Sequence, residues 1–117
     1  FTAKLIDVHP PTPAWPRGFA MNLTDSVVRC RYREGFDYET WLRPGEIVEV
    51  LIEPQAISNV FLKGHRIRLD VSSSNFPRFD VNPNTGEPCG RERGLATAAN
   101  TVHLDAAHPS SITLNTH

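Results

Sequence analysis

Prolines and glycines interrupt this chain so regularly that no long helix fits between them. Ten prolines and seven glycines are spread among short apolar runs. Proline removes a backbone N–H donor and ends helices, and both residue types favour turns. Short strands that follow one another at intervals of roughly 10 residues are typical of an antiparallel β-sandwich. We therefore predict an all-β fold of six or seven short strands.

The clearest strand lies in residues 63–87, KGHRIRLDVSSSNFPRFDVNPNTGE. Its first part alternates with period 2, as a half-buried strand requires. One face is predicted to carry His65, Ile67, Leu69 and Val71, and the other Arg66, Arg68, Asp70 and Ser72. After Ser72 the alternation stops and turn formers follow. In this loop Phe76, Arg78 and Phe79 surround a proline, and we expect them to pack against another surface.

The other predicted elements are weaker. Residues 20–24 and 27–33 suggest a hairpin with its turn at residues 25–26, and residues 55–61 are long enough for a short helix. Further strands are expected at residues 1–8, 47–53, 97–105 and 111–115.

Composition limits the kind of protein. A chain of 117 residues with 39% hydrophobic residues suits one domain with a single core. A net charge of -1 gives no reason to expect nucleic acid or an anionic membrane as partner, and no apolar run approaches the roughly 18 residues of a membrane span. Cys30 and Cys89 can pair or remain free thiols. The sequence does not decide between a cytoplasmic and a secreted protein.

Catalytic and metal motifs are scarce. The Gly-x-Ser-x-Gly turn of α/β-hydrolases is absent, and nothing in the spacing connects residues 72–74, three serines, to a histidine and an aspartate. His103, Asp105 and His108 lie close enough in sequence to form a metal site. We favour hydrogen bonding for them, with Asp105 at a strand end and His103 bonded to backbone. We therefore expect no cofactor, no metal and no catalytic residue.

Six segments resemble the C-terminal domain of the cocaine esterase and X-Pro dipeptidyl-peptidase family of serine hydrolases. They are FTAKLIDV, NLTDSVVRCRYRE, LRPGE, SNVFLKGH, GHRIRLDVSSSNFPRFDVNPNTGE and NTVHLDAAHPSSITL. The resemblance implies a jelly-roll β-sandwich, like a galactose-binding domain, at the C-terminal end of a larger enzyme. It also implies that the Ser-Asp-His triad lies in a preceding α/β-hydrolase domain of the same parent chain, so that this piece alone is inert.

Two consequences of the resemblance concern assembly. Residues 1–117 would be the latter part of the sandwich, because the first strands of the family's domain would precede Phe1. An incomplete sandwich leaves strand edges and an apolar face uncovered. We therefore expect this chain to form a homo-oligomer.

Two functions follow from these observations. In the first, the domain supports the catalytic domain and shapes its acyl pocket through a docking loop. The candidate docking residues are Asn75, Phe76, Arg78, Phe79 and Asp80. In the second, the domain binds a carbohydrate or another small ligand, with Trp15 or Trp41 as a stacking platform. The resemblance does not distinguish ester, amide and X-Pro peptide substrates of the parent enzyme.

Overall fold

The computed structural model describes residues 1–88, 90–91 and 93–115. It contains two compact units, Phe1–Asn82 and Pro83–His117, which are considered separately below. Cys89 lies outside the described residues, so its predicted alternatives, a disulfide with Cys30 or a free thiol, fall outside them too. Cys30 itself is half-buried.

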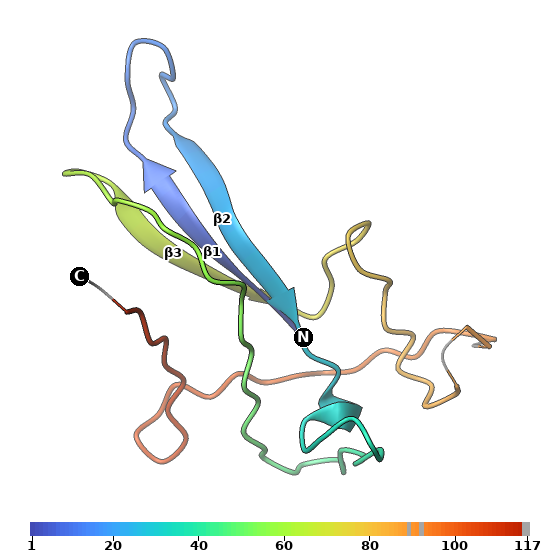
Figure 1. Ribbon diagram of the computed structural model, residues 1–117. Helices are drawn as coiled ribbons and strands as arrows, with labels where there is room; N and C mark the ends of the chain where they lie inside the picture. Colours follow the sequence, from blue (N-terminus) through green and yellow to red (C-terminus); the bar gives the residue numbers. More distant parts are fainter. Residues whose placement is uncertain (89, 92, 116–117) are drawn as a thin grey trace. The chain divides into compact units, whose positions relative to one another are not determined.

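The first unit contains a three-stranded antiparallel sheet (Figure 1). Its strands are β1 (Thr2–His9), β2 (Phe19–Val27) and β3 (Arg66–Ser72), in the order β2-β1-β3. The described residues form one open sheet with almost no helix, which confirms the all-β antiparallel class and is consistent with an incomplete β-sandwich. The outer edges of β2 and β3 carry no further strand from the described part of the chain.

The register of the sheet explains the alternation seen in the sequence. Leu5 on β1 lies opposite Leu69 on β3, and Asp7 lies opposite Ile67. Directly paired residues of neighbouring strands point to the same face. Val8 pairs with Arg66, so the next position of the register puts His9 opposite His65. Both lie two residues from the Asp7–Ile67 pair and therefore belong to the same face as that pair. The predicted strand and its two faces are therefore confirmed, but its half-buried character is wrong, because the apolar face of β3 is exposed.

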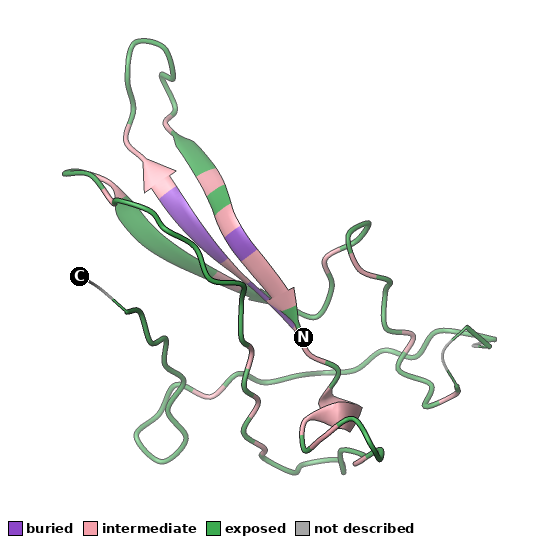
Figure 2. Ribbon diagram, in the orientation of Figure 1, coloured by how far each residue is buried: buried purple, intermediate pink, exposed green. Residues whose placement is uncertain are grey.

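The core of this unit is built on the central strand. Ala3, Leu5 and Ile6 are its buried hydrophobic residues, and Asp7 is the most deeply buried charged one, at 2% exposure. Figure 2 shows that burial is concentrated on β1, whereas β3 is mostly exposed. This follows from topology, since only the central strand has a neighbour on both sides.

The hairpin predicted around residues 25–26 is wrong. Asp25 and Ser26 lie within β2, paired with Lys4 and Ala3 of β1. The chain instead reverses direction in the proline-rich segment 10–18, which joins β1 to β2 at one end of the sheet (Figure 1). Gly18 makes that reversal possible because its φ of 67° is unfavourable for residues with a side chain.

The predicted strand at residues 27–33 is also wrong beyond Val27. Residues Cys30–Tyr32 form a short 3-10 helix, η1. The N–H of Tyr32 donates to the carbonyl of Arg29 at 2.8 Å, and the N–H of Arg33 donates to that of Cys30 at 3.2 Å. These local hydrogen bonds replace those that a strand would make to a neighbour.

Several further elements predicted from the sequence do not form. Residues 47–53, 97–105 and 111–115 are not strands, and residues 55–61 are not a helix. A strand needs a neighbour for its N–H and C=O groups, and within the described residues these segments have no pairing strand. The count of six or seven strands is thus too high, although the fold class is correct.

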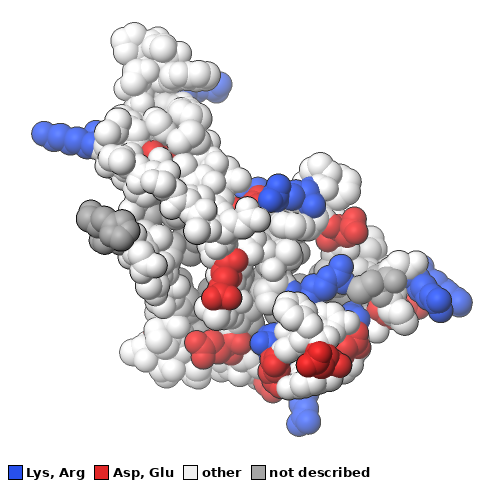
Figure 3. All heavy atoms as spheres, viewed as in Figure 1, with Lys and Arg blue, Asp and Glu red and all other residues white. Residues whose placement is uncertain are grey.

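Charged side chains and helix length are two further features of the structure. On the face drawn in Figure 3, both acidic and basic side chains are visible. Within the described residues, no helix is long and apolar enough to cross a bilayer.

Candidate functional site

The predicted docking loop, residues 75–80, follows β3 and contacts β2. Arg78 Nε lies 2.7 Å from Asp25 Oδ1, and Asn75 Nδ2 donates a hydrogen bond to Asp25 Oδ2 at 3.2 Å. The Asp25 side chain is only 8% exposed, while that of Arg78 is 58% exposed. Both oxygens of a nearly buried carboxylate are therefore satisfied by the loop, which fixes the loop to the sheet.

The loop is also closed by contacts of its own. The backbone N–H of Phe79 donates to the carbonyl of Asn75 at 3.1 Å, and the Arg78 guanidinium lies 5.5 Å from the centroid of the Phe79 ring. Phe79 is half-buried. The structure thus brings Asn75, Arg78 and Phe79 together on the body of the first unit.

The other two candidate docking residues, Phe76 and Asp80, are exposed. Phe76 is 70% exposed, and Asp80 is exposed as well. Of the two aromatic residues, Phe79 is thus partly covered within this chain and Phe76 is not, and their docking on another surface stays a prediction. An exposed aromatic ring on a fixed loop is a feature of protein contact surfaces.

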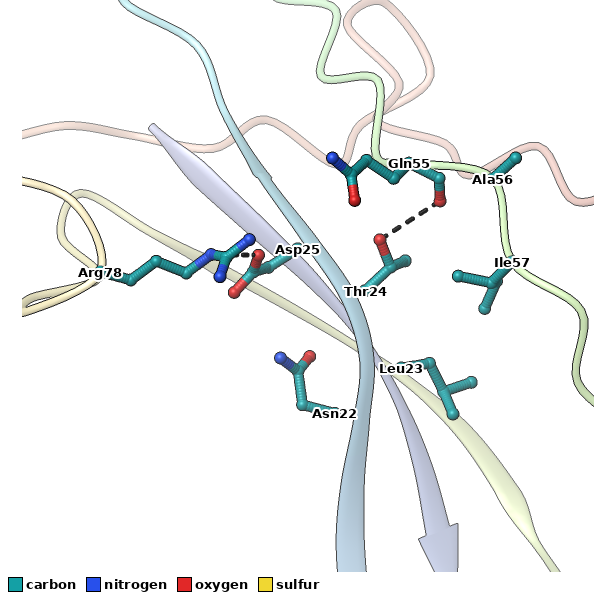
Figure 4. Close-up of a pocket in the computed structure, with 8 residues that line it drawn as sticks. All are labelled: Asn22, Leu23, Thr24, Asp25, Gln55, Ala56, Ile57 and Arg78. Carbon is teal, nitrogen blue, oxygen red and sulfur yellow. Dashed lines mark hydrogen bonds and ion pairs between the residues drawn. The ribbon is translucent and has the colours of Figure 1, made fainter.

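A small open pocket of about 220 Å³ lies beside this loop (Figure 4). Arg78 reaches Asp25 on one side of β2, and Gln55 approaches on the other, where the Thr24 hydroxyl donates to the Gln55 carbonyl at 3.2 Å. The lining is mostly polar, so the pocket suits a hydrogen-bonding group from a partner surface. It is formed by Asn22, Leu23, Thr24, Asp25, Gln55, Ala56, Ile57 and Arg78.

The second unit brings together His103, Asp105 and His108. Asp105 Oδ1 accepts the backbone N–H groups of Ala107 and His108, both at 2.9 Å, and the two imidazoles lie 3.5 Å and 3.4 Å from the carboxylate. The pKa of Asp105 is lowered, and the largest cause is the hydrogen bond from the backbone N–H of His108. Partial burial acts in the opposite direction but is outweighed. The carboxylate thus binds backbone N–H groups, as the hydrogen-bonding interpretation expects, but at a turn and not at a strand end. The expected bond from His103 to backbone is wrong, because its ring lies against Asp105.

Sequence reasoning missed a second cluster of the same chemical kind, which lies in the first unit. His65 Nδ1 is 2.9 Å and 3.0 Å from the two carboxylate oxygens of Asp7, and His9 Nε2 is 3.5 Å from Oδ2. The spacing Asp-x-His in residues 7–9 puts two ligand types on one face of a strand. That signal was available, but the pairing of His65 opposite His9 depends on the β1-β3 register, which the sequence does not specify.

The described part of the chain is an all-β domain, and its sequence places it in a known family. Residues 1–113 match the family described as the X-Pro dipeptidyl-peptidase C-terminal non-catalytic domain, and the chain belongs to this family. A curated relative, the cocaine esterase of Rhodococcus sp. (strain MB1 Bresler), is 50% identical over 116 residues. The match covers 97% of this chain and 19% of that protein. The resemblance predicted from the six sequence segments is therefore confirmed.

Proposed function

We propose that residues 1–117 are the C-terminal part of a non-catalytic β-domain in a larger serine hydrolase of the X-Pro dipeptidyl-peptidase and acyl esterase class. The observation that carries the proposal is the family match over residues 1–113. The relative's name, cocaine esterase, supports a parent enzyme that hydrolyses acyl compounds. In this proposal an α/β-hydrolase domain of the parent chain supplies the nucleophile, acid and base, and this domain supplies none of them.

The domain would dock on the catalytic domain through Asn75, Phe76, Arg78, Phe79 and Asp80 and help to form the wall of the acyl pocket. Asp25 holds Asn75 and Arg78 on the sheet, so the 70% exposed ring of Phe76 is presented by a fixed loop. Fixing an aromatic ring before contact lowers the entropy cost of binding. Aromatic residues at such positions contribute disproportionately to interface energy.

The test uses the full-length hydrolase with Phe76→Ala and, as matched control, Phe36→Ala. Phe36 is 91% exposed and lies in a different loop. We expect Phe76→Ala to lower the melting temperature by a few degrees and to reduce kcat/KM on ester and X-Pro anilide substrates. Phe36→Ala should leave both unchanged. Wild-type values for Phe76→Ala would rule out the docking role.

We also propose that the isolated chain associates with itself. Ile67, Leu69 and Val71 on β3 are 52%, 43% and 47% exposed, and they share one face of an edge strand. Edge strands with apolar side chains tend to pair with other chains. Light scattering at micromolar concentration should therefore give at least the mass of a dimer, and a monomer with a cooperative melt would contradict this.

A second candidate function is binding of a carbohydrate or another small ligand. Trp15 is 60% exposed and stacks on Phe19 with centroids 5.6 Å apart, and Phe19 lines an open pocket of about 570 Å³. Trp41 is 50% exposed, with Arg31 4.4 Å from its ring centroid. Exposed aromatic rings of this kind can stack on apolar sugar faces. Saturable quenching of tryptophan fluorescence by a glycan, lost in Trp15→Ala or Trp41→Ala, would favour this function over docking.

A further inference from the structure

Three side chains with metal-binding atoms converge on one face of the sheet, where β1 ends and β3 begins. Asp7 and His9 are two residues apart on β1, and His65 directly precedes β3 in the position opposite His9. The rings of His9 and His65 have their centroids 4.2 Å apart. One carboxylate oxygen and one nitrogen from each ring lie within 4.8 Å of one another.

One ring nitrogen of His9 in this cluster, Nε2, lacks a hydrogen-bond partner. This nitrogen is buried and, among the buried side-chain polar atoms of the described residues, is the one without a hydrogen bond. Burying a polar atom without a partner costs free energy. Asp7 Oδ2 is 3.5 Å from His9 Nε2, which is beyond the range of a good hydrogen bond. A group between the two atoms would give His9 Nε2 the partner that it lacks.

We propose that Asp7, His9 and His65 bind a divalent transition-metal ion, with zinc as the best match to the donor set. Two imidazoles and one carboxylate are ligands that zinc commonly takes. A tetrahedral ion with bonds of about 2.1 Å separates its donor atoms by about 3.4 Å, and His9 Nε2 and Asp7 Oδ2 are 3.5 Å apart.

His65 requires a small adjustment to act as the third ligand. Its Nδ1 is 2.9 Å from Asp7 Oδ1 because a proton joins them in a hydrogen bond. When the ion replaces that proton, the neutral ring carries its proton on Nε2, and Nδ1 moves about half an ångström from the carboxylate. The His65 side chain is 9% exposed and its ring lies 4.2 Å from that of His9, so the two imidazoles would move together as the ion enters.

The surroundings also suit an ion. Asn59 makes a side-chain hydrogen bond to Asp7, and it would orient the carboxylate as an outer-shell partner. His9 also lines the open pocket of about 570 Å³, which provides a route for entry.

The site would be structural, because its ligands come from two parts of the chain that are far apart in sequence. Asp7 and His9 are separated from His65 by the whole segment 10–64. A bound ion would connect the central strand to the edge strand at the end of the sheet and would stabilise the folded state in proportion to its affinity.

The test is zinc binding by the full chain, without a histidine tag and freed of metal by a chelator. Competition with a chromophoric chelator should show one zinc ion per chain, and cobalt(II) in its place should give the absorption bands of a tetrahedral site. His9→Gln should weaken zinc binding at least about 100-fold, since even outer-shell partners are worth 10- to 100-fold. Zinc should raise the melting temperature of the wild type and not that of His9→Gln.

The control variant is His103→Gln with His108→Gln, which removes the histidines of the cluster in the second unit. It should retain the zinc affinity of the wild type. His9→Gln removes ring contacts with Phe19 and His65, so it should melt lower than the wild type in chelator, and a cooperative melt there shows that the variant folds. Equal zinc affinity in wild type and His9→Gln, loss of binding only in the control, or no zinc bound at micromolar concentration would overturn the proposal. None of these results depends on whether the parent protein is a hydrolase.

Discussion

Glu39 shows how a surface loop of this domain is held by a few charged and polar contacts. The Tyr32 hydroxyl donates to Glu39 Oε1 at 2.8 Å, and Arg31 Nη1 donates to the same oxygen at 3.2 Å. The hydrogen bond from Tyr32 lowers the pKa of Glu39 most strongly, partial burial opposes it, and Arg31 lowers it further. The charged form of Glu39 is therefore favoured in the folded state.

This contact predicts a pH dependence of stability. A carboxyl whose pKa is lowered on folding contributes stability above its ordinary value of 4.5, and the contribution is lost as the pH falls through the lowered value. Glu39→Gln keeps an acceptor for Tyr32 but cannot ionise. Wild type should melt higher than Glu39→Gln at pH 7, and the difference should shrink by pH 3. A difference that does not change with pH would contradict this assignment.

Gly18 is a residue whose backbone conformation permits no side chain. Its φ is 67°, and a Cβ atom there would lie 2.5 Å from the backbone carbonyl oxygen of His9. We expect Gly18→Ala to lower the free energy of unfolding by more than about 1 kcal/mol. Gly94→Ala is the control, since its Cβ would meet no atom within 4 Å. Similar urea midpoints for the two variants would show that the turn at Gly18 can rearrange.

At the scale of elements, burial separates the central strand from its neighbours. Leu5 and Leu69 face each other across β1 and β3, yet Leu5 is 7% exposed and Leu69 43%. Leu5→Ala should cost about 2–4 kcal/mol of unfolding free energy, and Leu69→Ala about 1 kcal/mol. Urea unfolding of the two variants measures the difference. Equal costs would mean that the β3 face is covered in solution, for example by a second copy.

The elements also show what the sequence can and cannot predict. Residues 1–8 and 65–72 were both correctly predicted as strands, and for residues 65–72 the reason is that a period of 2 with one apolar face is a local signal. The 47–53 and 111–115 segments carry similar apolar residues, but the described residues provide no neighbouring strand for them. Strand formation depends on a partner that composition does not reveal.

In the candidate site, too, contacts between residues far apart in sequence could not be predicted. Residues 75–80 stood out because aromatic and charged side chains surround a proline. Their attachment to Asp25 was hidden, because Asp25 was predicted to lie in a turn and in fact lies on β2 beside β1. The Asp7, His9 and His65 cluster was hidden for the same reason, since long-range register brings its members together.

At the scale of the whole molecule, the family match relates the chain to one part of a longer relative. The chain covers 19% of its curated relative and matches a domain described as non-catalytic. In the proposed function its contribution is an aromatic contact on a fixed loop, with the chemistry carried out elsewhere in the parent chain. The exposed state of Phe76 is then a property of the isolated domain.

The central claim is that residues 75–80 dock on a catalytic domain, and amide hydrogen exchange tests it most directly. Exchange at these residues would be compared between the isolated chain and the full-length hydrolase, with residues 36–41 as an internal control. We predict exchange at least about tenfold slower for residues 75–80 in the full-length protein, because docking protects their N–H groups, and no change in the control loop. Equal exchange of residues 75–80 in both proteins would contradict the account.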